Sequence, residues 1–290
     1  MIRLSYLVST RNKISSIKDS MNRLILAKQA DEEIVVVDGG STDGGREYLE
    51  GLYRDGKIDQ FISEPDFGES HAFNKAFLMA RGELLKLITD DDYFLYSEIQ
   101  ACKEFMLEHP QVDLLATNGA KKRLENASVF GLFAYDEDYR RWLENKIPFS
   151  FCGLGLMLRK KSLPLIGLLD PEYVKTDAEF SLRVTSGKAS LAWYTGITYI
   201  HIAHPQGNTI TKHERIYAET VKLDYLYFRK SVSLISRGRR AIMKVFKMAL
   251  PSKKIVPEVQ SMDVQRIFES CDQWVKKDNR AVRGRFLYRS

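Results

Sequence analysis

Residues 33–44 read EIVVVDGGSTDG, and this stretch decides the fold class. Its four β-favouring residues, 34–37, predict a short strand that stops at Asp38 and two glycines. The polar residues 41–43 then offer capping oxygens before REYLEGLY, which has the spacing of a helix. The stretch therefore predicts a strand, a turn and a helix, with a carboxylate at the carboxyl end of the strand.

The same alternation continues on either side of this unit. Strands that alternate with helices at this spacing predict an α/β fold with a mainly parallel sheet covered by helices. In such folds the ligand binds at the carboxyl ends of the strands, where Asp38 and the run of aspartates at 90–92 are expected. Further strands are predicted at residues 3–9, 61–63, 84–89 and 112–117, and further helices at 17–28, 71–82 and 97–108.

The composition is that of an ordinary globular protein, because 44% of the 290 residues are hydrophobic. The three cysteines are far apart and have no metal-binding spacing, so neither a disulfide framework nor a zinc site is expected. No apolar stretch approaches the roughly 18 residues of a membrane-spanning helix, and we expect a cytoplasmic protein. The glycine-rich signatures of dinucleotide-binding proteins and of phosphate-loop nucleotidases are missing, which argues against both classes.

The three aspartates at residues 90–92 follow a hydrophobic strand. Carboxylates this close repel one another, and a divalent cation removes that cost. Oxygen-only ligands favour Mg²⁺ or Mn²⁺, whose remaining ligands are water and phosphate. The alternative is a solvated acidic turn that caps the next helix. Asp38 also has two interpretations: its carboxylate binds a nucleobase or ribose, or it only forms the turn after its strand.

Five stretches of the sequence together resemble one family. LSYLVSTRN, EIVVVDGGSTDG and GESHAFNKAFLMARGELLKLITDDD resemble the family-2 nucleotide-sugar glycosyltransferases, and CGLGLMLRKK with IGLLDPEYVKTDAEFSLRV is similar to the acceptor-side segment of that family. The resemblance covers roughly residues 2–210 and implies a GT-A-type fold with a Rossmann-like sheet. It also implies an inverting glycosyltransferase. The donor would be a nucleotide diphospho-sugar, with a UDP-sugar favoured, and the acceptor a hydroxyl of a glycan or lipid-linked molecule in cell-surface polysaccharide synthesis.

The resemblance further implies roles for single residues on the donor side. Asp38 falls where a carboxylate of the family binds the base, and Asp90 also belongs to the nucleotide site. Because Thr89 takes the first acidic position of the family's metal-binding motif, Asp91 is favoured as the metal ligand, together with Asp92. The residues that follow the first strand, where the family contacts the nucleotide, are Thr10, Arg11 and Asn12.

Two other roles are carried over from the acceptor-side half. Asp177 matches the catalytic base of the family, which accepts the proton of the acceptor hydroxyl as that hydroxyl attacks. His204 lies near the place where many members have a histidine beside the metal or the diphosphate, and His201 is the competing candidate. Either histidine is alternatively a partly buried strand residue.

Charge divides the chain into two parts. Residues 1–215 hold 27 basic and 31 acidic side chains, whereas residues 216–290 hold 17 basic and 7 acidic ones. We therefore expect a catalytic domain at 1–215, with a nucleotide-binding half at about 1–120 and an acceptor half at about 121–215. A basic helical C-terminal extension at 216–290 follows.

Within the extension, residues 229–254 combine nine basic side chains with an apolar stripe at helical spacing. This pattern is typical of a helix that lies on an anionic membrane, and such a protein would be peripheral on the inner membrane face. Alternatively, the stripe packs on the catalytic body. Nucleic acid is not an expected partner, because no binding module accompanies the charge.

Two other functions are compatible with parts of the pattern. A sugar-nucleotide nucleotidyltransferase would have a glycine-rich loop and a lysine after the first strand, whereas residues 9–12 read STRN. A non-catalytic nucleotide-binding or membrane-peripheral scaffold would tolerate loss of the acidic residues, which are all present.

Overall fold

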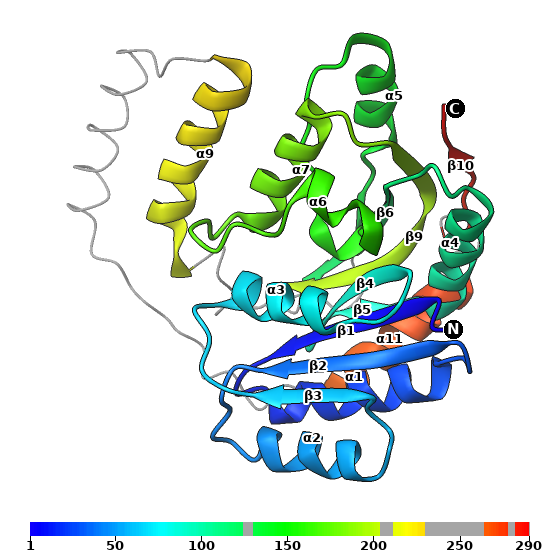
Figure 1. Cartoon of the computed structure of the whole chain (residues 1–290), viewed down its shortest axis with the longest axis vertical. Helices are drawn as coiled ribbons and strands as arrows, with labels where there is room; N and C mark the ends of the chain where they lie inside the picture. Colours follow the sequence, from blue (N-terminus) through cyan, green and yellow to red (C-terminus); the bar gives the residue numbers. More distant parts are fainter. Residues whose placement is uncertain (124–129, 204–210, 230–263, 278–281, 290) are drawn as a thin grey trace.

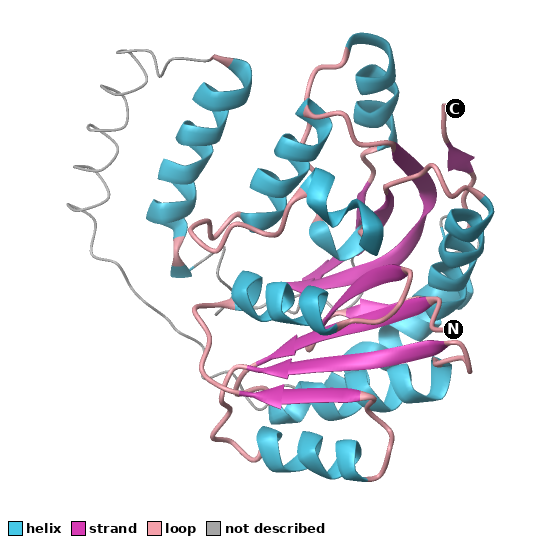
Figure 2. Cartoon of the chain, viewed as in Figure 1, coloured by secondary structure: helices cyan, strands magenta, loops and turns pink. Residues whose placement is uncertain are grey.

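The computed structural model describes residues 1–123, 130–203, 211–229, 264–277 and 282–289. Its strands form one sheet with helices on both faces (Figures 1 and 2). The strands are β1 (Leu4–Thr10), β2 (Glu32–Asp38), β3 (Gln60–Ser63), β4 (Leu84–Thr89), β5 (Tyr93–Phe94), β6 (Leu114–Arg123), β7 (Phe130–Phe133), β8 (Met157–Arg159), β9 (Leu191–Ala203) and β10 (Phe286–Leu287).

The order across the sheet is β10-β9-β6-β8-β4-β1-β2-β3, and β5 and β7 pair with β9 and β6. Strands β1, β2, β3 and β4 pair in parallel, as do β6 and β9. The short strands β5, β7, β8 and β10 run in the opposite direction. The expected mainly parallel sheet is therefore confirmed, and its parallel strands end at a common edge.

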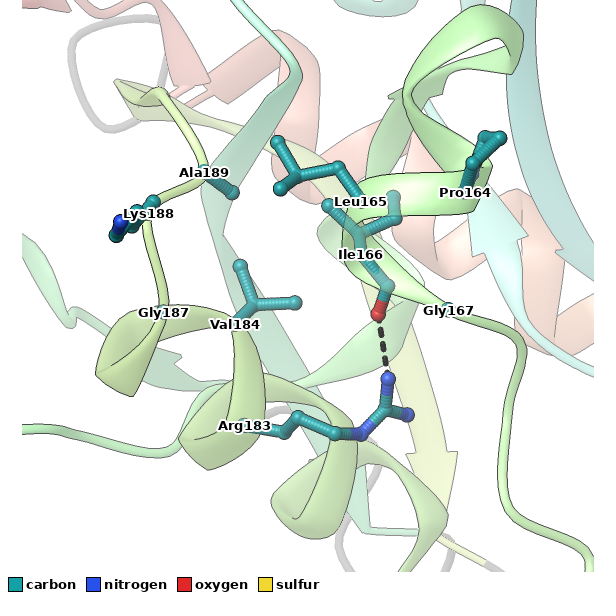
Figure 3. Close-up of a pocket in the computed structure, with 9 residues that line it drawn as sticks. All are labelled: Pro164, Leu165, Ile166, Gly167, Arg183, Val184, Gly187, Lys188 and Ala189. Atoms are coloured by element: carbon teal, nitrogen blue, oxygen red, sulfur yellow. Dashed lines mark hydrogen bonds between the residues drawn. The ribbon is translucent and has the colours of Figure 1, made fainter.

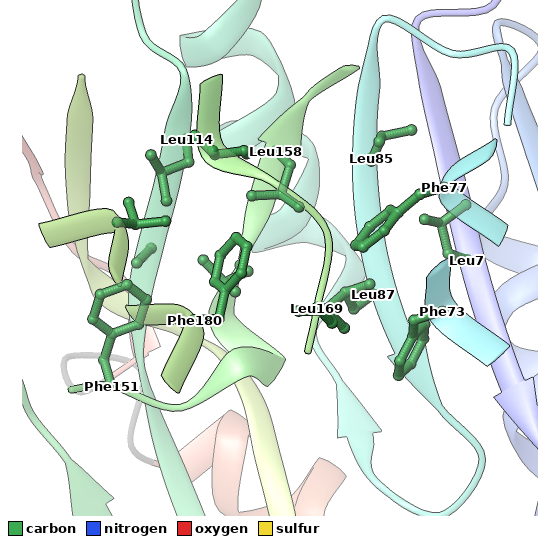
Figure 4. Packing of buried hydrophobic residues seen from close by; sticks show 14 of the residues in the cluster. Leu7, Phe73, Phe77, Leu85, Leu87, Leu114, Phe151, Leu158, Leu169 and Phe180 are labelled. Carbon is green, nitrogen blue, oxygen red and sulfur yellow. The ribbon is translucent and has the colours of Figure 1, made fainter. Parts of the chain in front are cut away.

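Two layers of helices cover the sheet. Helices α3, α5, α6 and α7 lie on one face, where Phe73 and Phe77 lie beside Leu7 and Leu87, and Phe180 belongs to the same buried cluster (Figure 4). Helices α1, α2 and α4 cover the other face through a second buried cluster. Their bounds are α1 (Ile14–Ala27), α2 (Gly45–Arg54), α3 (Glu69–Met79), α4 (Tyr96–Glu108), α5 (Asp136–Asn145), α6 (Leu163–Ile166) and α7 (Thr176–Ser186), with 3-10 turns at η1 (Gly153–Gly155) and η2 (Lys160–Ser162).

Most predicted elements of the first half are confirmed, with a difference at the end of α3. This helix was expected to continue to Gly82, but it ends at Met79. The N–H of Gly82 instead donates to Ser5 Oγ at 2.9 Å, so that residue already approaches the sheet. The apolar residues 149–158 are extended only in part, because η1 interrupts them before β8.

The last part of the chain has two further helices, α9 (His213–Phe228) and α11 (Val264–Lys277). Helix α11 packs on the sheet through Phe268 and Cys271. A bidentate ion pair between Arg23 of α1 and Asp272 of α11 joins these two helices. Strand β10 pairs with β9, so this end is not helical throughout. The domain boundary at residue 215 stays a prediction, but the described residues beyond 263 belong to the packed body.

The stretch that was interpreted as a membrane-binding helix lies almost entirely outside the described residues, because residues 230–263 are not among them. In the described part of the chain, no helix combines the length and the apolar character needed to span a bilayer.

Candidate active site

The carboxyl ends of β1, β2 and β4 meet at one edge of the sheet. Thr10 lies opposite Asp38 in the pairing of β1 with β2, and Ser9 lies opposite Thr89 in the pairing of β1 with β4. Thr10 Oγ1 donates to Asp90 Oδ2 at 2.7 Å. The structure thus brings together Thr10 and Asp90, which were both assigned to the nucleotide site.

Asp38 is fully buried at the end of β2. Its carboxylate accepts hydrogen bonds from the backbone N–H and the hydroxyl of Ser41, and from Ser63 Oγ at 2.6 Å. These bonds satisfy a buried charge and hold the loop after β2 against β3. A contact between Asp38 and a nucleobase stays a prediction, and here the carboxylate shapes the loop beneath that proposed contact.

Asn12 joins two loops at the same edge. Its backbone has φ +53°, a left-handed conformation that asparagine tolerates better than most residues. Its N–H donates to Ser41 Oγ, and its Oδ1 accepts from the N–H of Thr42, both at 2.8 Å. Asp43 Oδ2 accepts from the N–H of Ile14. The prediction that residues 41–43 cap α2 holds only for Asp43, whose Oδ1 accepts from the N–H of Gly45 at 3.0 Å, because the other contacts of these residues hold the loop that follows β1.

Beside these loops, Arg11 and Asp66 approach the backbone of Gly39. A Cβ atom on Gly39 would lie 2.4 Å from Asp66 Oδ2 and 3.1 Å from Arg11 Cδ. Only glycine therefore leaves room for both side chains above the ends of β1 and β2. Arg11 is exposed there, which agrees with its assignment to a ligand-binding surface.

Asp91 forms an ion pair with Lys13 from the start of α1. Lys13 Nζ lies 2.7 Å from Asp91 Oδ2, and the two side chains are 42% and 22% exposed. Burial alone would lower the pKa of Lys13, but the charge and hydrogen bond of Asp91 raise it above its usual value. A positive charge thus already faces the aspartate that was favoured as the metal ligand.

Asp92 is buried and contacts His201 from β9. Asp92 Oδ1 lies 3.0 Å from His201 Nδ1 and accepts from the N–H of Ile202, while Oδ2 accepts from Thr89 Oγ1. Burial opposes ionisation, but these bonds and the charge of His201 hold the pKa of Asp92 below its usual value. His201 therefore occupies the acidic site, whereas His204 lies outside the described residues.

The carboxylates of this site destabilise one another's charge. Burial, and then the neighbouring Asp91, raise the pKa of Asp90 to about 8. Glu69, at the start of α3, has an exposed side chain. The surrounding protein nevertheless displaces water from its carboxyl group, and this desolvation raises the pKa of Glu69 to about 7. Repulsion from Asp91, Asp92 and Asp177 adds to the increase. Such repulsion requires proximity. The hydroxyls of Ser70 and Thr176, the residues next to Glu69 and Asp177, lie 2.8 Å apart, so these two carboxylates belong to one site beside the acidic run.

The donor atoms were tested for their fit to a divalent cation. In the described ranges, no three His, Cys, Asp or Glu side chains converge so that all could hold one ion. Asp92 uses its oxygens on protein partners, whereas Asp91, which pairs with Lys13, is the most exposed carboxylate of the three. One or two carboxylates with water and phosphate are the usual ligands of Mg²⁺. The residues thus fit an ion that takes most of its ligands from outside the protein.

Asp177 lies in the first turn of α7 and is exposed to solvent. Its Oδ1 accepts from the N–H of Ala178 at 2.8 Å. A Cβ atom on Gly153 would lie 3.3 Å from Asp177 Cβ, so η1 closely contacts this aspartate. The surrounding protein nevertheless displaces water from the Asp177 carboxylate, and this desolvation raises its pKa. A carboxylate with a raised pKa is a better proton acceptor.

A pocket of about 190 Å³ lies elsewhere, between α6 and the end of α7 (Figure 3). It is lined by residues 164–167, 183–184 and 187–189, and Arg183 donates to the carbonyl of Ile166 across it. None of the aspartates lines this pocket. We place the chemistry at the acidic site because the titratable groups gather there.

Two residues of the site were missed from the sequence. Lys13 is 78 positions from Asp91, and Glu69 is the first residue of α3. Lys13 follows the segment 10–12 that was assigned to the nucleotide, which was the available signal. Glu69 had none, because a lone acidic residue at a helix start is common.

Comparison with known proteins identifies the family. A sequence model described as Glycosyl transferase family 2 matches residues 5–163. The chain belongs to this family. An uncharacterized glycosyltransferase of Nostoc sp. (strain PCC 7120) is 27% identical over 136 residues, which are 45% of this chain and 42% of that protein. The chain therefore matches less than half of the length of this curated relative.

Solved structures of low sequence identity have the same fold. Residues 1–349 of S. aureus TarS in complex with UDP-GlcNAc superimpose with a TM-score of 0.57 at 16% identity, covering 97% of this chain and 84% of that one. The mannosyltransferase PcManGT from Pyrobaculum calidifontis, in complex with GDP-Man and Mn²⁺, gives 0.56 at 15% identity, covering 96% and 75%. The expected GT-A fold is confirmed.

Proposed function

We propose that this glycosyltransferase moves a sugar from a nucleotide diphospho-sugar to an acceptor hydroxyl with inversion at the anomeric carbon. The observation that carries the proposal is the gathering of Asp91, Asp92, Glu69 and Asp177, from three separate parts of the chain, at the carboxyl edge of the sheet. Family membership supports the reaction class.

The donor would lie over the ends of β1, β2 and β4. Arg11 and Asp66 border the place of the base beside Gly39, and Asn12 holds the two loops that form it. Lys13 brings a positive charge toward the diphosphate. When Mg²⁺ or Mn²⁺ is bound at Asp91, it supplies further charge that stabilises the leaving diphosphate. The solved relatives with UDP-GlcNAc and with GDP-Man and Mn²⁺ support a donor of this class, and we favour a UDP-sugar.

Asp177 would accept the proton of the acceptor hydroxyl. A neutral hydroxyl is a poor nucleophile, so a carboxylate must take its proton during attack. The raised pKa of Asp177 favours this transfer, and the N–H of Ala178 together with the close contact of Gly153 orients the carboxylate. A single displacement on one face of the sugar inverts the configuration.

The acceptor is proposed to be a glycan or a lipid-linked molecule of cell-surface polysaccharide synthesis. Residues 229–254 would bring a cytoplasmic enzyme to an anionic inner membrane face, where such acceptors are available. Liposome flotation of the full chain tests this part, with a variant in which the lysines and arginines of 237–247 are replaced by glutamine. Equal binding of both proteins to phosphatidylserine vesicles contradicts it.

A donor screen tests the proposed reaction. Each nucleotide sugar of a panel is incubated with the protein and Mn²⁺, and release of nucleoside diphosphate is measured with simple sugar acceptors and without them. We expect one donor to be consumed, and calorimetry to show binding of its nucleoside diphosphate. Failure of UDP, GDP and all other nucleoside diphosphates to bind contradicts the proposal.

A further inference from the structure

Helix α9 lies beside α7 and begins beyond residue 163, where the match to the family model ends (Figure 1). The two helices share a small buried cluster in which Leu223 of α9 packs with Tyr173, Ala178 and Leu182. The segment 172–175, which leads into α7 and Asp177, is therefore covered by α9.

One carboxylate of α9 holds this segment by its backbone. Glu219 is only 8% exposed. Its Oε2 accepts hydrogen bonds from the N–H groups of Val174 and Lys175, both at 2.9 Å, and its Oε1 lies 3.0 Å from the Val174 nitrogen. A buried carboxylate that accepts backbone N–H groups makes stronger bonds than a neutral acceptor. It also fixes the direction of the segment.

Arg215 and Thr220 support the same contact. Arg215 Nε donates to Glu219 Oε1 at 2.9 Å, and a second nitrogen of its guanidinium donates to the carbonyl of Glu172. Lys175 Nζ donates to Thr220 Oγ1 at 3.0 Å. The charge of Glu219 is thus compensated. Arg215, Glu219 and Leu223, on successive turns of α9, all contact residues 172–175.

The segment is also held through Thr176, whose Oγ1 donates to the Tyr173 carbonyl at 2.9 Å and lies 2.8 Å from Ser70 Oγ of α3. No side chain caps the start of α7 at Lys175, and Asp177 follows two residues later. On its other side, Asp177 is in close contact with Gly153 of η1. The position of the proposed base is therefore set by η1, by the contact of Thr176 with α3, and by the Glu219 carboxylate, which holds the backbone of the segment before α7.

We propose that Glu219 is a positioning residue for Asp177, so that α9 is part of the catalytic unit and not only the start of a basic extension. This inference rests on the proposed role of Asp177 as base. It assigns to Glu219 the alignment of the base with the acceptor hydroxyl. Binding of the donor, which involves the ends of β1, β2 and β4, does not depend on it.

Substitutions of Glu219 separate its parts. In Glu219→Ala the N–H groups of Val174 and Lys175 lose their acceptor, the segment relaxes, and a base displaced by about 1 Å costs up to roughly 100-fold in rate. In Glu219→Gln an amide oxygen at the position of Oε2 keeps the two 2.9 Å backbone bonds, whereas the amide nitrogen at the position of Oε1 loses the ion pair with Arg215 and the second contact with the Val174 N–H. Glu214, exposed on the same helix, offers the matched control Glu214→Ala.

The experiment measures kcat, the dissociation constant of the nucleoside diphosphate, and the melting temperature for the four full-length proteins. We expect kcat of Glu219→Ala to fall 10- to 100-fold with nucleotide affinity within twofold, while Glu219→Gln stays within about threefold of the parent and Glu214→Ala is unchanged.

Three results overturn the inference: an unchanged kcat in Glu219→Ala, an equal loss in Glu219→Gln, or a parallel loss of nucleotide binding that indicates general unfolding. If the parent protein transfers no sugar at all, the proposed function itself fails, and this outcome is distinguishable from the other three.

Discussion

The ion pair between Lys13 and Asp91 makes a quantitative prediction about cation binding. A divalent ion on Asp91 would face the ammonium group of Lys13, which contacts the same carboxylate at 2.7 Å. Replacing this lysine removes both the competing partner and the repulsion. We therefore expect Lys13→Met to bind Mn²⁺ more tightly than the parent protein when no nucleotide is present.

The size of the effect follows from the exposure of the pair. Because Lys13 is 42% exposed, the ion pair itself contributes only about 0.5–1 kcal/mol. Two unit charges about 4 Å apart in water interact by about 1 kcal/mol, and a divalent ion doubles this value. A net change of about 1–2 kcal/mol corresponds to roughly 5- to 30-fold in affinity.

Titration of Mn²⁺ followed by electron paramagnetic resonance measures free ion directly and needs no activity. Lys18→Met is the matched control, because Lys18 is an exposed residue of the same helix and its loss changes the net charge equally. Mn²⁺ affinity that is unchanged or weaker in Lys13→Met refutes the reasoning, and so does an equal gain in both variants.

Three other predictions concern single contacts. In Gly153→Ala the new methyl group would press on Asp177 Cβ at 3.3 Å. Because a shift of even a few tenths of an ångström misplaces the base, kcat should fall several-fold while the melting temperature changes by only a few degrees. Full activity would contradict the placement of Asp177. Phe268→Ala should lower the free energy of unfolding in urea by about 3–5 kcal/mol, because this ring is 4% exposed and packs on Tyr93. A loss no larger than that of the control Gln265→Ala, at an exposed position of α11, would show that this helix is not part of the folded body. His201→Gln should destabilise the metal-free protein more at pH 5.5 than at pH 9. The lowered pKa of Asp92 gives stability that is lost as pH falls below about 4, and the raised pKa of His201 gives stability that is present below about 6.5 and lost as pH rises through its folded value. An equal loss of urea stability in the variant at both pH values would argue against the pair.

Local patterns in the sequence predicted the first half of the fold well. The apolar run at 34–37 and its counterpart at 84–89 became the buried strands β2 and β4, because strands covered on both faces need continuous apolar residues. The acidic run after β4 was also placed correctly at the carboxyl edge, since parallel strands end together. These features depend on residues that are close in sequence.

The features that were missed depend on partners far away in the chain. Asp43 looked like a cap for α2, and its Oδ1 does accept from the N–H of Gly45 at the start of that helix, but its Oδ2 accepts from the N–H of Ile14 at the start of α1. Glu219 contacts Val174 from 45 positions away, and no local pattern distinguishes it from the other acidic residues of a helix. The end of the chain was expected to be helical, yet residues 286–287 join the sheet by pairing with β9. The role of Asp177 came from the family resemblance and not from its local pattern.

The central claim is that Asp177 is the base of a sugar transfer for which the donor is bound elsewhere. It is tested most directly by measuring donor consumption and nucleoside diphosphate binding on Asp177→Asn, which keeps the shape of the side chain and removes its ability to accept a proton. The account predicts that transfer to the acceptor falls by at least about 100-fold, within the usual range for a general base, while calorimetric affinity for the nucleotide stays within about twofold. Near-normal transfer by Asp177→Asn would contradict the account.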